Sequence, residues 1–235
     1  MKKIIYIIAI FLTCVLNLNA RTFVLSVGIS NYNNEKINLH QTTKDAKSFR
    51  EVMLQRSRDI SVLTSSYANH DNILKTLRKI ANYSQEDDCI IFFYSGHGSE
   101  GSLVTYDNYL SYTEILSVLN TAKAKTKICY IDACFSGSVA KVILSDDGKI
   151  KYPDICFMVS CRPEETSIEN SLAGAGFFTK ALLQGLRGMS DVDHNGKITL
   201  EELFKYVALD VAKRSKEKQH PQLYADQSKW QYVVY

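Results

Sequence analysis

Two short segments of the chain carry side chains that could do nucleophilic chemistry. Ser95-Gly96-His97-Gly98 follows one apolar run, and Asp132-Ala133-Cys134-Phe135-Ser136-Gly137 follows another. A thiolate is a strong nucleophile, and a histidine within hydrogen-bond reach can take the thiol proton and later protonate a leaving amine. We therefore expect Cys134 to be a nucleophile and His97 its acid/base partner.

The glycines beside this pair favour an oxyanion hole. Gly96, Gly98 and Gly137 let the backbone turn sharply, so that main-chain N–H groups can point at a developing oxyanion. The candidate donors are the N–H groups of Gly98 and Cys134. A single His or Cys is more often a loop or packing residue, but the occurrence of both after apolar runs with glycine flanks favours catalysis.

The elements that must position the pair alternate between two patterns. Short apolar runs predict strands at residues 23–29, 60–63, 89–94, 127–131, 155–159 and 231–235. Helical patterns lie between them at residues 43–55, 70–83, 112–121, 173–186 and 200–216. This alternation predicts an α/β fold, a three-layer α/β/α sandwich with a mostly parallel sheet of about six strands. Ligands bind at the carboxyl ends of such strands, where His97 and Cys134 would lie side by side if their strands are neighbours.

One segment, residues 137–153, shows neither pattern and is rich in Ser, Asp, Gly and Lys. We expect a long irregular connection there, either functional or a plain surface loop.

Taken together, the two motifs resemble the catalytic signatures of the caspase and metacaspase superfamily. The likeness extends to Gly28-Ile29 with Tyr32, to Leu39 and Asp45-Ala46, to Ser160-Cys161-Arg162 with Glu164, and to Gly176-Phe177-Phe178-Thr179. It covers nearly all of residues 21–235. The resemblance implies a caspase-like fold and a cysteine endopeptidase that hydrolyses protein or peptide substrates through a thioester and requires no cofactor for its chemistry.

The residue at position 132 separates this chain from animal caspases, which carry Gln-Ala-Cys there. Asp132 resembles metacaspases and their bacterial relatives. That resemblance implies that Asp45 and Asp132, with Ser95, bind the residue before the cleaved bond and select Arg or Lys, and paired carboxylates do favour a cation. The alternatives are a helix first-turn carboxylate for Asp45 and a turn carboxylate for Asp132. The superfamily also suggests self-cleavage at Lys141, Lys149 or Lys151.

A second constellation fits the calcium loop of an EF-hand. Its candidate ligands are Asp191, Asp193, Asn195, Lys197 and Glu202, with Gly196 at the turn. Thr199 and Glu202 also form a helix capping box, so the loop has a structural interpretation as well. His40, His70 and His220 lack the spacing of a zinc site.

The first twenty residues have a different composition. Lys2 and Lys3 precede an apolar run that ends near Ala20, which is typical of a secretory signal peptide and too short for a membrane span. We expect cleavage after Ala20 and export to the periplasm or the medium, with lipidation at Cys14 as a minor alternative. The domains expected are thus the signal peptide at 1–20 and a peptidase domain at 21–235.

Composition limits the partners. The chain has 235 residues, 28 Lys and Arg against 25 Asp and Glu, and no basic cluster, which argues against nucleic-acid binding. Cys89, Cys129 and Cys156 lie in or beside apolar runs and are expected to be buried, inert thiols. The alternative functions are a catalytically silent caspase-like scaffold, a protease that cleaves after Asp, and a calcium-sensing module. Oligomeric state stays open.

Overall fold

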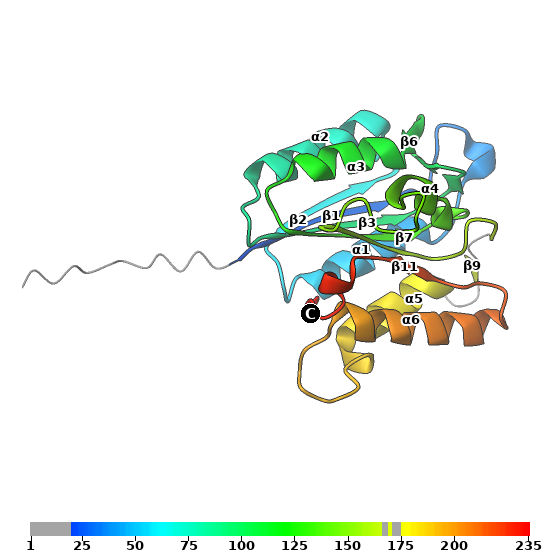
Figure 1. The fold of residues 1–235 in the computed structure, drawn as a ribbon. Helices are drawn as coiled ribbons and strands as arrows, with labels where there is room; N and C mark the ends of the chain where they lie inside the picture. The colour runs from blue at the N-terminus through cyan, green and yellow to red at the C-terminus, as the bar shows by residue number, and fades with distance from the viewer. Residues whose placement is uncertain (1–19, 166–168, 171–174) are drawn as a thin grey trace, which may run out of the picture.

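A six-stranded sheet lies at the centre of the computed structural model, which describes residues 20–165, 169–170 and 175–235. Its strand order is β11-β8-β7-β3-β1-β2, and all strands are parallel except β11 (Figure 1). The strands are β1 (Thr22–Gly28), β2 (Asp59–Thr64), β3 (Cys89–Ser95), β7 (Thr126–Asp132), β8 (Ile155–Val159) and β11 (Gln222–Tyr224). This confirms the expected fold class.

Helices cover both faces of the sheet. One face packs against α2 and α3, and the other against α1, α5 and α6 (Figure 1). These helices are α1 (Thr42–Met53), α2 (His70–Tyr83), α3 (Tyr112–Thr121), α5 (Phe177–Gln184) and α6 (Leu200–Ser215). Because both faces are covered, β1, β3, β7 and β8 are buried along their whole length and are mostly apolar in sequence.

Side-chain caps explain where several helices begin. Ser111 and Glu114 form a capping box before α3, and Thr199 and Glu202 form another before α6. The Asn69 side chain accepts a hydrogen bond at the start of α2. The expected bounds of α2 and α3 are therefore confirmed.

Smaller elements decorate the carboxyl end of the sheet. A three-stranded antiparallel sheet, β4-β5-β6, follows directly after His97. These and the other short elements are β4 (Gly98–Ser99), β5 (Ser102–Val104), β6 (Tyr109–Ser111), β9 (Glu169–Asn170), β10 (Ala175–Gly176), α4 (Ala140–Ile143), η1 (Glu35–Ile37), η2 (Ser65–Tyr67), η3 (Ser136–Val139), η4 (Gly185–Met189) and η5 (Gln227–Lys229).

The expectation of an irregular segment at 137–153 is wrong for its first half. There η3 and α4 bury Val139 and Ile143, which lie four residues apart and thus on one helical face. A bridge between Leu144 and Ile150 then closes a turn that carries Lys149 at its exposed edge. The segment is too short for its helical period to stand out from the polar residues around it.

The expected strand at 231–235 is also wrong. The edge of the sheet is taken by β11, while the C-terminal segment pairs with the chain before α6 through Ile198 and packs Val234 into the core. Aromatic alternation predicts an extended segment but does not determine which element it pairs with. The expected helix at 173–186 begins only at Phe177, and its first two positions lie outside the described residues.

The helices of the described part of the chain are all too short or too polar to cross a bilayer. The expected signal peptide, including Cys14, falls almost entirely on residues 1–19, outside the described residues.

Candidate active site

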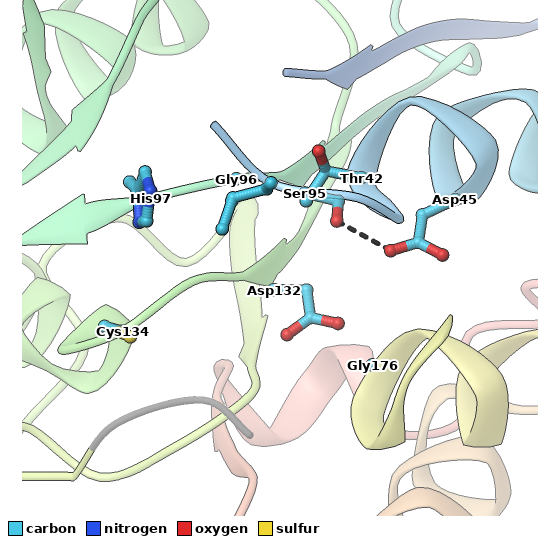
Figure 2. A pocket seen from close by; sticks show the side chains of 9 residues that line it. Thr42, Asp45, Ser95, Gly96, His97, Asp132, Cys134 and Gly176 are labelled. Carbon is cyan, nitrogen blue, oxygen red and sulfur yellow. Dashed lines mark hydrogen bonds between the residues drawn. The ribbon is translucent and has the colours of Figure 1, made fainter. Parts of the chain in front are cut away.

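The pairing of β3 with β7 brings the two motifs together. Ser95 lies opposite Asp132 in the parallel register, and the Gly96 N–H donates to the Asp132 carbonyl oxygen at 3.1 Å. His97 and Cys134 each follow two residues later. Both line a cavity of about 230 Å³ at the carboxyl ends of the strands, with Asp45 and Asp132 further along its wall (Figure 2). Residues that the sequence analysis expected in one site thus line one cavity.

Two tyrosine hydroxyls hold the backbone of His97. The His97 N–H donates to the Tyr32 hydroxyl at 2.8 Å. The Tyr94 hydroxyl donates to the His97 carbonyl oxygen, also at 2.8 Å. The Tyr32 and His97 rings are in contact, with centroids 5.1 Å apart. A Cβ at position 96 would come within 2.5 Å of the Tyr94 hydroxyl and 2.8 Å of the Tyr32 hydroxyl, so only glycine fits between them.

A backbone carbonyl orients the His97 ring. Its Nε2 lies 2.7 Å from the carbonyl oxygen of Ile37. A carbonyl can only accept, so Nε2 carries the proton and Nδ1 is the nitrogen left to accept another. The loop that presents Ile37 is closed by the Asn38 side chain, which accepts from the Tyr32 N–H at 2.8 Å.

Hydrogen bonds connect the turn that carries Cys134 to the end of β8. The Ser160 hydroxyl accepts from the Ala133 N–H at 3.2 Å and contacts the Ala133 carbonyl oxygen at 3.1 Å. The Phe135 N–H donates to the Glu165 carbonyl oxygen at 3.0 Å. A Cβ on Gly98 would lie 2.3 Å from the Cys134 carbonyl oxygen, so the two segments that carry the candidate oxyanion donors are in direct backbone contact.

Burial separates Cys134 from the other cysteines in the described part of the chain. Cys89, Cys129, Cys156 and Cys161 are buried, whereas Cys134 is partly accessible. Burial raises the pKa of Cys89 to about 11 and that of Cys156 to about 12, and it also raises the pKa values of Cys129 and Cys161. Among the described cysteines, Cys134 is the thiol that a reactant can reach.

Two buried carboxylates form the far wall of the cavity. Asp45, in the first turn of α1, accepts from the Ser95 hydroxyl at 2.9 Å. Asp132 accepts from the N–H and the hydroxyl of Thr179, at 3.1 and 2.7 Å. A Cβ on Gly176 would lie 2.8 Å from Asp132, so glycine leaves room for this carboxylate.

The structural roles expected as alternatives for these two aspartates are present in part. Asp45 does occupy a helix first turn, and Asp132 does bond a backbone N–H, although this N–H comes from α5 rather than from its own turn. Both carboxylates nevertheless line the cavity. Each aspartate therefore has structural hydrogen bonds and also lines the cavity.

The residues of the EF-hand-like loop lie elsewhere, and none of them lines this cavity. Oxygen atoms of Asp191, Asp193 and Glu202 lie within 4.8 Å of one another. Both oxygens of Asp191 accept from backbone N–H groups of Asn195 and Gly196, and Glu202 caps α6. The Lys197 N–H donates to the Asn195 side chain.

Several residues of the site carried no assigned role at the sequence level. Tyr94 opens the His97 motif that resembles the family but was given no role of its own. Ile37 acts through its backbone carbonyl, which leaves no trace in the side-chain pattern. Tyr32 and Thr179 belong to segments that carry the family likeness, and this likeness was the available signal for them.

Comparison with known proteins agrees with this geometry. The family model of the caspase domain, peptidase C14, matches residues 21–231. Protein GSU0716 from Geobacter sulfurreducens has a similar structure, with a TM-score of 0.69 and 17% identity over 91% of this chain and 98% of that one. Caspase-1 from Spodoptera frugiperda has a TM-score of 0.67 and 18% identity over 89% of this chain and 90% of that one.

No curated protein is significantly similar to the chain in sequence. At these identities the two structures support the fold, whereas the family model spans most of the chain and includes both motifs. The chain therefore belongs to the caspase-domain family of cysteine peptidases, peptidase C14.

Proposed function

We propose that this protein is an exported cysteine endopeptidase in which Cys134 and His97 form the catalytic dyad and which cleaves after Arg or Lys. The observation that carries the proposal is one cavity lined by both members of the dyad and by two buried carboxylates, Asp45 and Asp132.

The acylation step follows from the orientation of His97. With its Nε2 proton donated to the Ile37 carbonyl, Nδ1 accepts the Cys134 proton, and the thiolate adds to the scissile carbonyl carbon. The backbone N–H groups of Gly98 and Cys134 stabilise the oxyanion. The C–N bond then breaks, and the proton on Nδ1 moves to the leaving amine.

Deacylation regenerates the site. Water gives a proton to Nδ1 and adds to the thioester carbonyl, the C–S bond breaks, and the His97 proton returns to the Cys134 sulfur. The product acid departs with its basic side chain from the acidic wall. The carboxylates of Asp45 and Asp132 favour a guanidinium or ammonium group there and repel an aspartate.

The direct test uses fluorogenic peptides that end in Arg, Lys or Asp before a coumarin group. We expect the protein from residue 21 onward to cleave after Arg and Lys, and Cys134→Ala to lose this activity. Asp132→Asn should reduce cleavage after Arg by about a hundredfold, since a charge-assisted contact contributes several kcal/mol in a buried site. Cleavage after Asp by the wild-type protein would overturn the assignment of the carboxylates but not of the nucleophile.

The rival proposal is a silent caspase-like scaffold. It leaves the accessible thiol and the protonation geometry of His97 without a purpose. A wild-type protein that cleaves none of these peptides, yet binds them with the affinity of Cys134→Ala, would favour the scaffold.

Self-cleavage between the nucleophile and β8 is a second proposal about regulation. Lys141, Lys149 and Lys151 are all exposed. Lys141 is paired with Glu100 across two segments and Lys149 with the nearby Asp147, while Lys141 lies within the helix α4, where the backbone is less open to cleavage than in the turn after it. Mass spectrometry of active wild-type protein and of Cys134→Ala should find cleavage after Lys149 or Lys151 in the first alone. An intact, fully active chain would rule out self-cleavage as a requirement.

Calcium binding at the 191–202 loop is a proposal that concerns stability rather than chemistry. The oxygens of Asp191, Asp193 and Glu202 are close enough to share one ion. If they do, calcium at a hundred times its dissociation constant stabilises the fold by about 2.7 kcal/mol. An unchanged melting temperature in calcium and in chelator, with Asp193→Ala as control, would remove this proposal.

Export is proposed from the first twenty residues alone. Expression of the full chain in a bacterial host should give a periplasmic or released product that begins at Arg21, as read by N-terminal sequencing. A product that keeps residues 1–20 in the cytoplasm would contradict it.

A further inference from the structure

A second cavity, of about 560 Å³, is lined by the residues that directly follow His97 and Cys134 in the chain. The first cavity is lined by Gly96, His97 and Cys134, and the second by the residues that come next, Gly98 and Phe135. Its remaining lining is Ser99, Glu100, Ser138, Lys141, Pro163 and Glu164. The candidate nucleophile Cys134 lines the first cavity, and the residue after it lines the second.

Three segments of the chain enclose this second cavity, and they are tied to one another. The Gly101 N–H donates to the Ser138 hydroxyl at 2.9 Å, and Lys141 forms an ion pair with Glu100. The Phe135 N–H donates to the Glu165 carbonyl oxygen at 3.0 Å. These contacts hold the hairpin after His97, the turn after Cys134 and the turn after β8 around one space.

Phe135 is unusual in both backbone and exposure. Its φ of 56° lies in the left-handed region, which costs free energy for a bulky residue, and the residue is 36% exposed. Such strain persists where the surrounding structure enforces it and is concentrated at functional sites. Here it keeps a large apolar side chain at the rim of a cavity directly after the nucleophile.

The chemistry of the lining is apolar with a negative edge. Phe135 and Pro163 supply the apolar surface. Lys141 and Glu100 neutralise each other, and the exposed carboxylate of Glu164 then leaves the cavity with an excess negative charge. An acidic side chain would be repelled there, and a large apolar one would bury surface against Phe135.

We infer that this cavity receives the side chain of the residue that follows the scissile bond, and that it takes a large apolar side chain and disfavours an acidic one. The inference rests on the proposed function. The basic residue before the bond occupies the acidic cavity, and the leaving amine takes its proton from His97. The departing residue must therefore lie beside His97, where the hairpin that begins at Gly98 forms the wall.

The test uses internally quenched peptides with a fixed sequence through Arg and one varied residue after it, either Phe, Leu, Ala or Asp. We expect kcat/KM for Phe and Leu to exceed that for Asp by about tenfold. Phe135→Asn, which tolerates the left-handed backbone, should reduce the Phe-to-Ala ratio severalfold. Glu164→Gln should lower the ratio of kcat/KM for the Ala peptide to kcat/KM for the Asp peptide. Each ratio is taken within one variant, so a general loss of activity does not affect it.

A matched control is Glu86→Gln. Glu86 is 68% exposed, pairs with Lys125 and precedes β3 at the opposite end of the sheet, so its removal should leave all ratios unchanged. Equal kcat/KM for all four peptides, or unchanged ratios in Phe135→Asn, would overturn the inference. Arg-coumarin, which has no residue after the bond, reads the dyad and the acidic cavity alone. If wild-type protein failed to cleave it, the proposed function and this inference would both be wrong.

Discussion

Burial decides which thiols of this protein can react. The proton-bound form of Cys89 and Cys156 is favoured because their pKa values are raised to about 11 and about 12, so neither forms a thiolate near neutral pH while the protein is folded. Cys134 is partly accessible.

This difference predicts selective alkylation. At pH 8, iodoacetamide should label Cys134 first in protein that begins at residue 21, and the buried thiols should react only in urea, where their pKa values return to about 8.5. Peptide mapping by mass spectrometry measures the order. Labelling of Cys156 at the rate of Cys134 under native conditions would contradict it.

Tyr32 and Tyr94 act on His97 through its backbone. Tyr32→Phe removes the oxygen that accepts the His97 N–H and leaves that N–H without its partner, at a cost of about 1–3 kcal/mol. We expect kcat for an Arg peptide to fall about tenfold with KM changed less than twofold, because the acidic cavity is untouched.

The control for this prediction is Tyr67→Phe, since Tyr67 is 74% exposed and does not line the cavity that contains His97. A fall in melting temperature without a change in kcat would mean that the Tyr32 hydroxyl stabilises the fold and does not position His97.

Among the helices, α5 has a direct part in the site because its first turn holds Asp132. Thr179→Val keeps the shape of the side chain but removes the hydroxyl that donates to this buried carboxylate, while Thr179→Ser keeps the donor. A hydrogen bond to a charged group contributes about 1.5–3 kcal/mol. We expect Thr179→Val to raise KM for Arg peptides about tenfold and Thr179→Ser to change it little. Equal effects of the two variants would assign the role to packing.

The link between α2 and α3 should depend on pH. The His70 Nδ1 lies 3.0 Å from a carboxylate oxygen of Asp71, and its Nε2 lies 3.0 Å from a carboxylate oxygen of Glu114. The hydrogen bond to Asp71 is the main cause of the raised pKa of His70, and Glu114 raises it further. A pKa raised in the folded state means that the contribution is fully present below the unfolded value of about 6.5 and is lost as pH rises through the folded value.

Urea unfolding should therefore show a larger stability difference between wild type and His70→Asn at pH 5.5 than at pH 8.5. The same difference at both pH values would show that His70 contributes without its charge.

For the molecule as a whole, the C-terminal segment joins regions that are distant in sequence. Val234 is buried, the Arg56 side chain donates to the Val233 carbonyl oxygen at 2.8 Å, and the Tyr235 hydroxyl lies 2.7 Å from the Gln55 side chain. The same segment pairs with Ile198 before α6. It thereby connects α1, which carries Asp45, with the loop that carries the candidate calcium ligands.

Truncation after Gln231 should lower stability. The loss of buried Val234 alone costs about 1.5–3 kcal/mol, and 1 kcal/mol corresponds to about 2–4 °C in a domain of this size. We expect a melting temperature about 5–10 °C lower by calorimetry, with Gln231→Ala in the full-length chain as control. An unchanged melting temperature would mean that the segment is not part of the folded core.

Local pattern determined a large part of this protein. Apolar runs were enough for five strands of the sheet, and helical periodicity was enough for the bounds of α2 and α3, because both patterns depend on neighbours in the sequence. Glycine flanks and residue type identified His97 and Cys134 for the same reason. The resemblance to a family supplied the roles proposed for Asp45 and Asp132.

The remaining features depended on contacts between distant segments. The pairing of β11 instead of residues 231–235, the Ile37 carbonyl that orients His97 and the Thr179 donors that hold Asp132 are long-range contacts, which no local period records. Tertiary structure alone decided that Cys134 is accessible and the other described cysteines are not, because burial depends on which faces pack together. It also decided that one cavity is lined by His97 and Cys134 and a second by the residues that follow them, since the walls come from segments that meet only after the strands have paired.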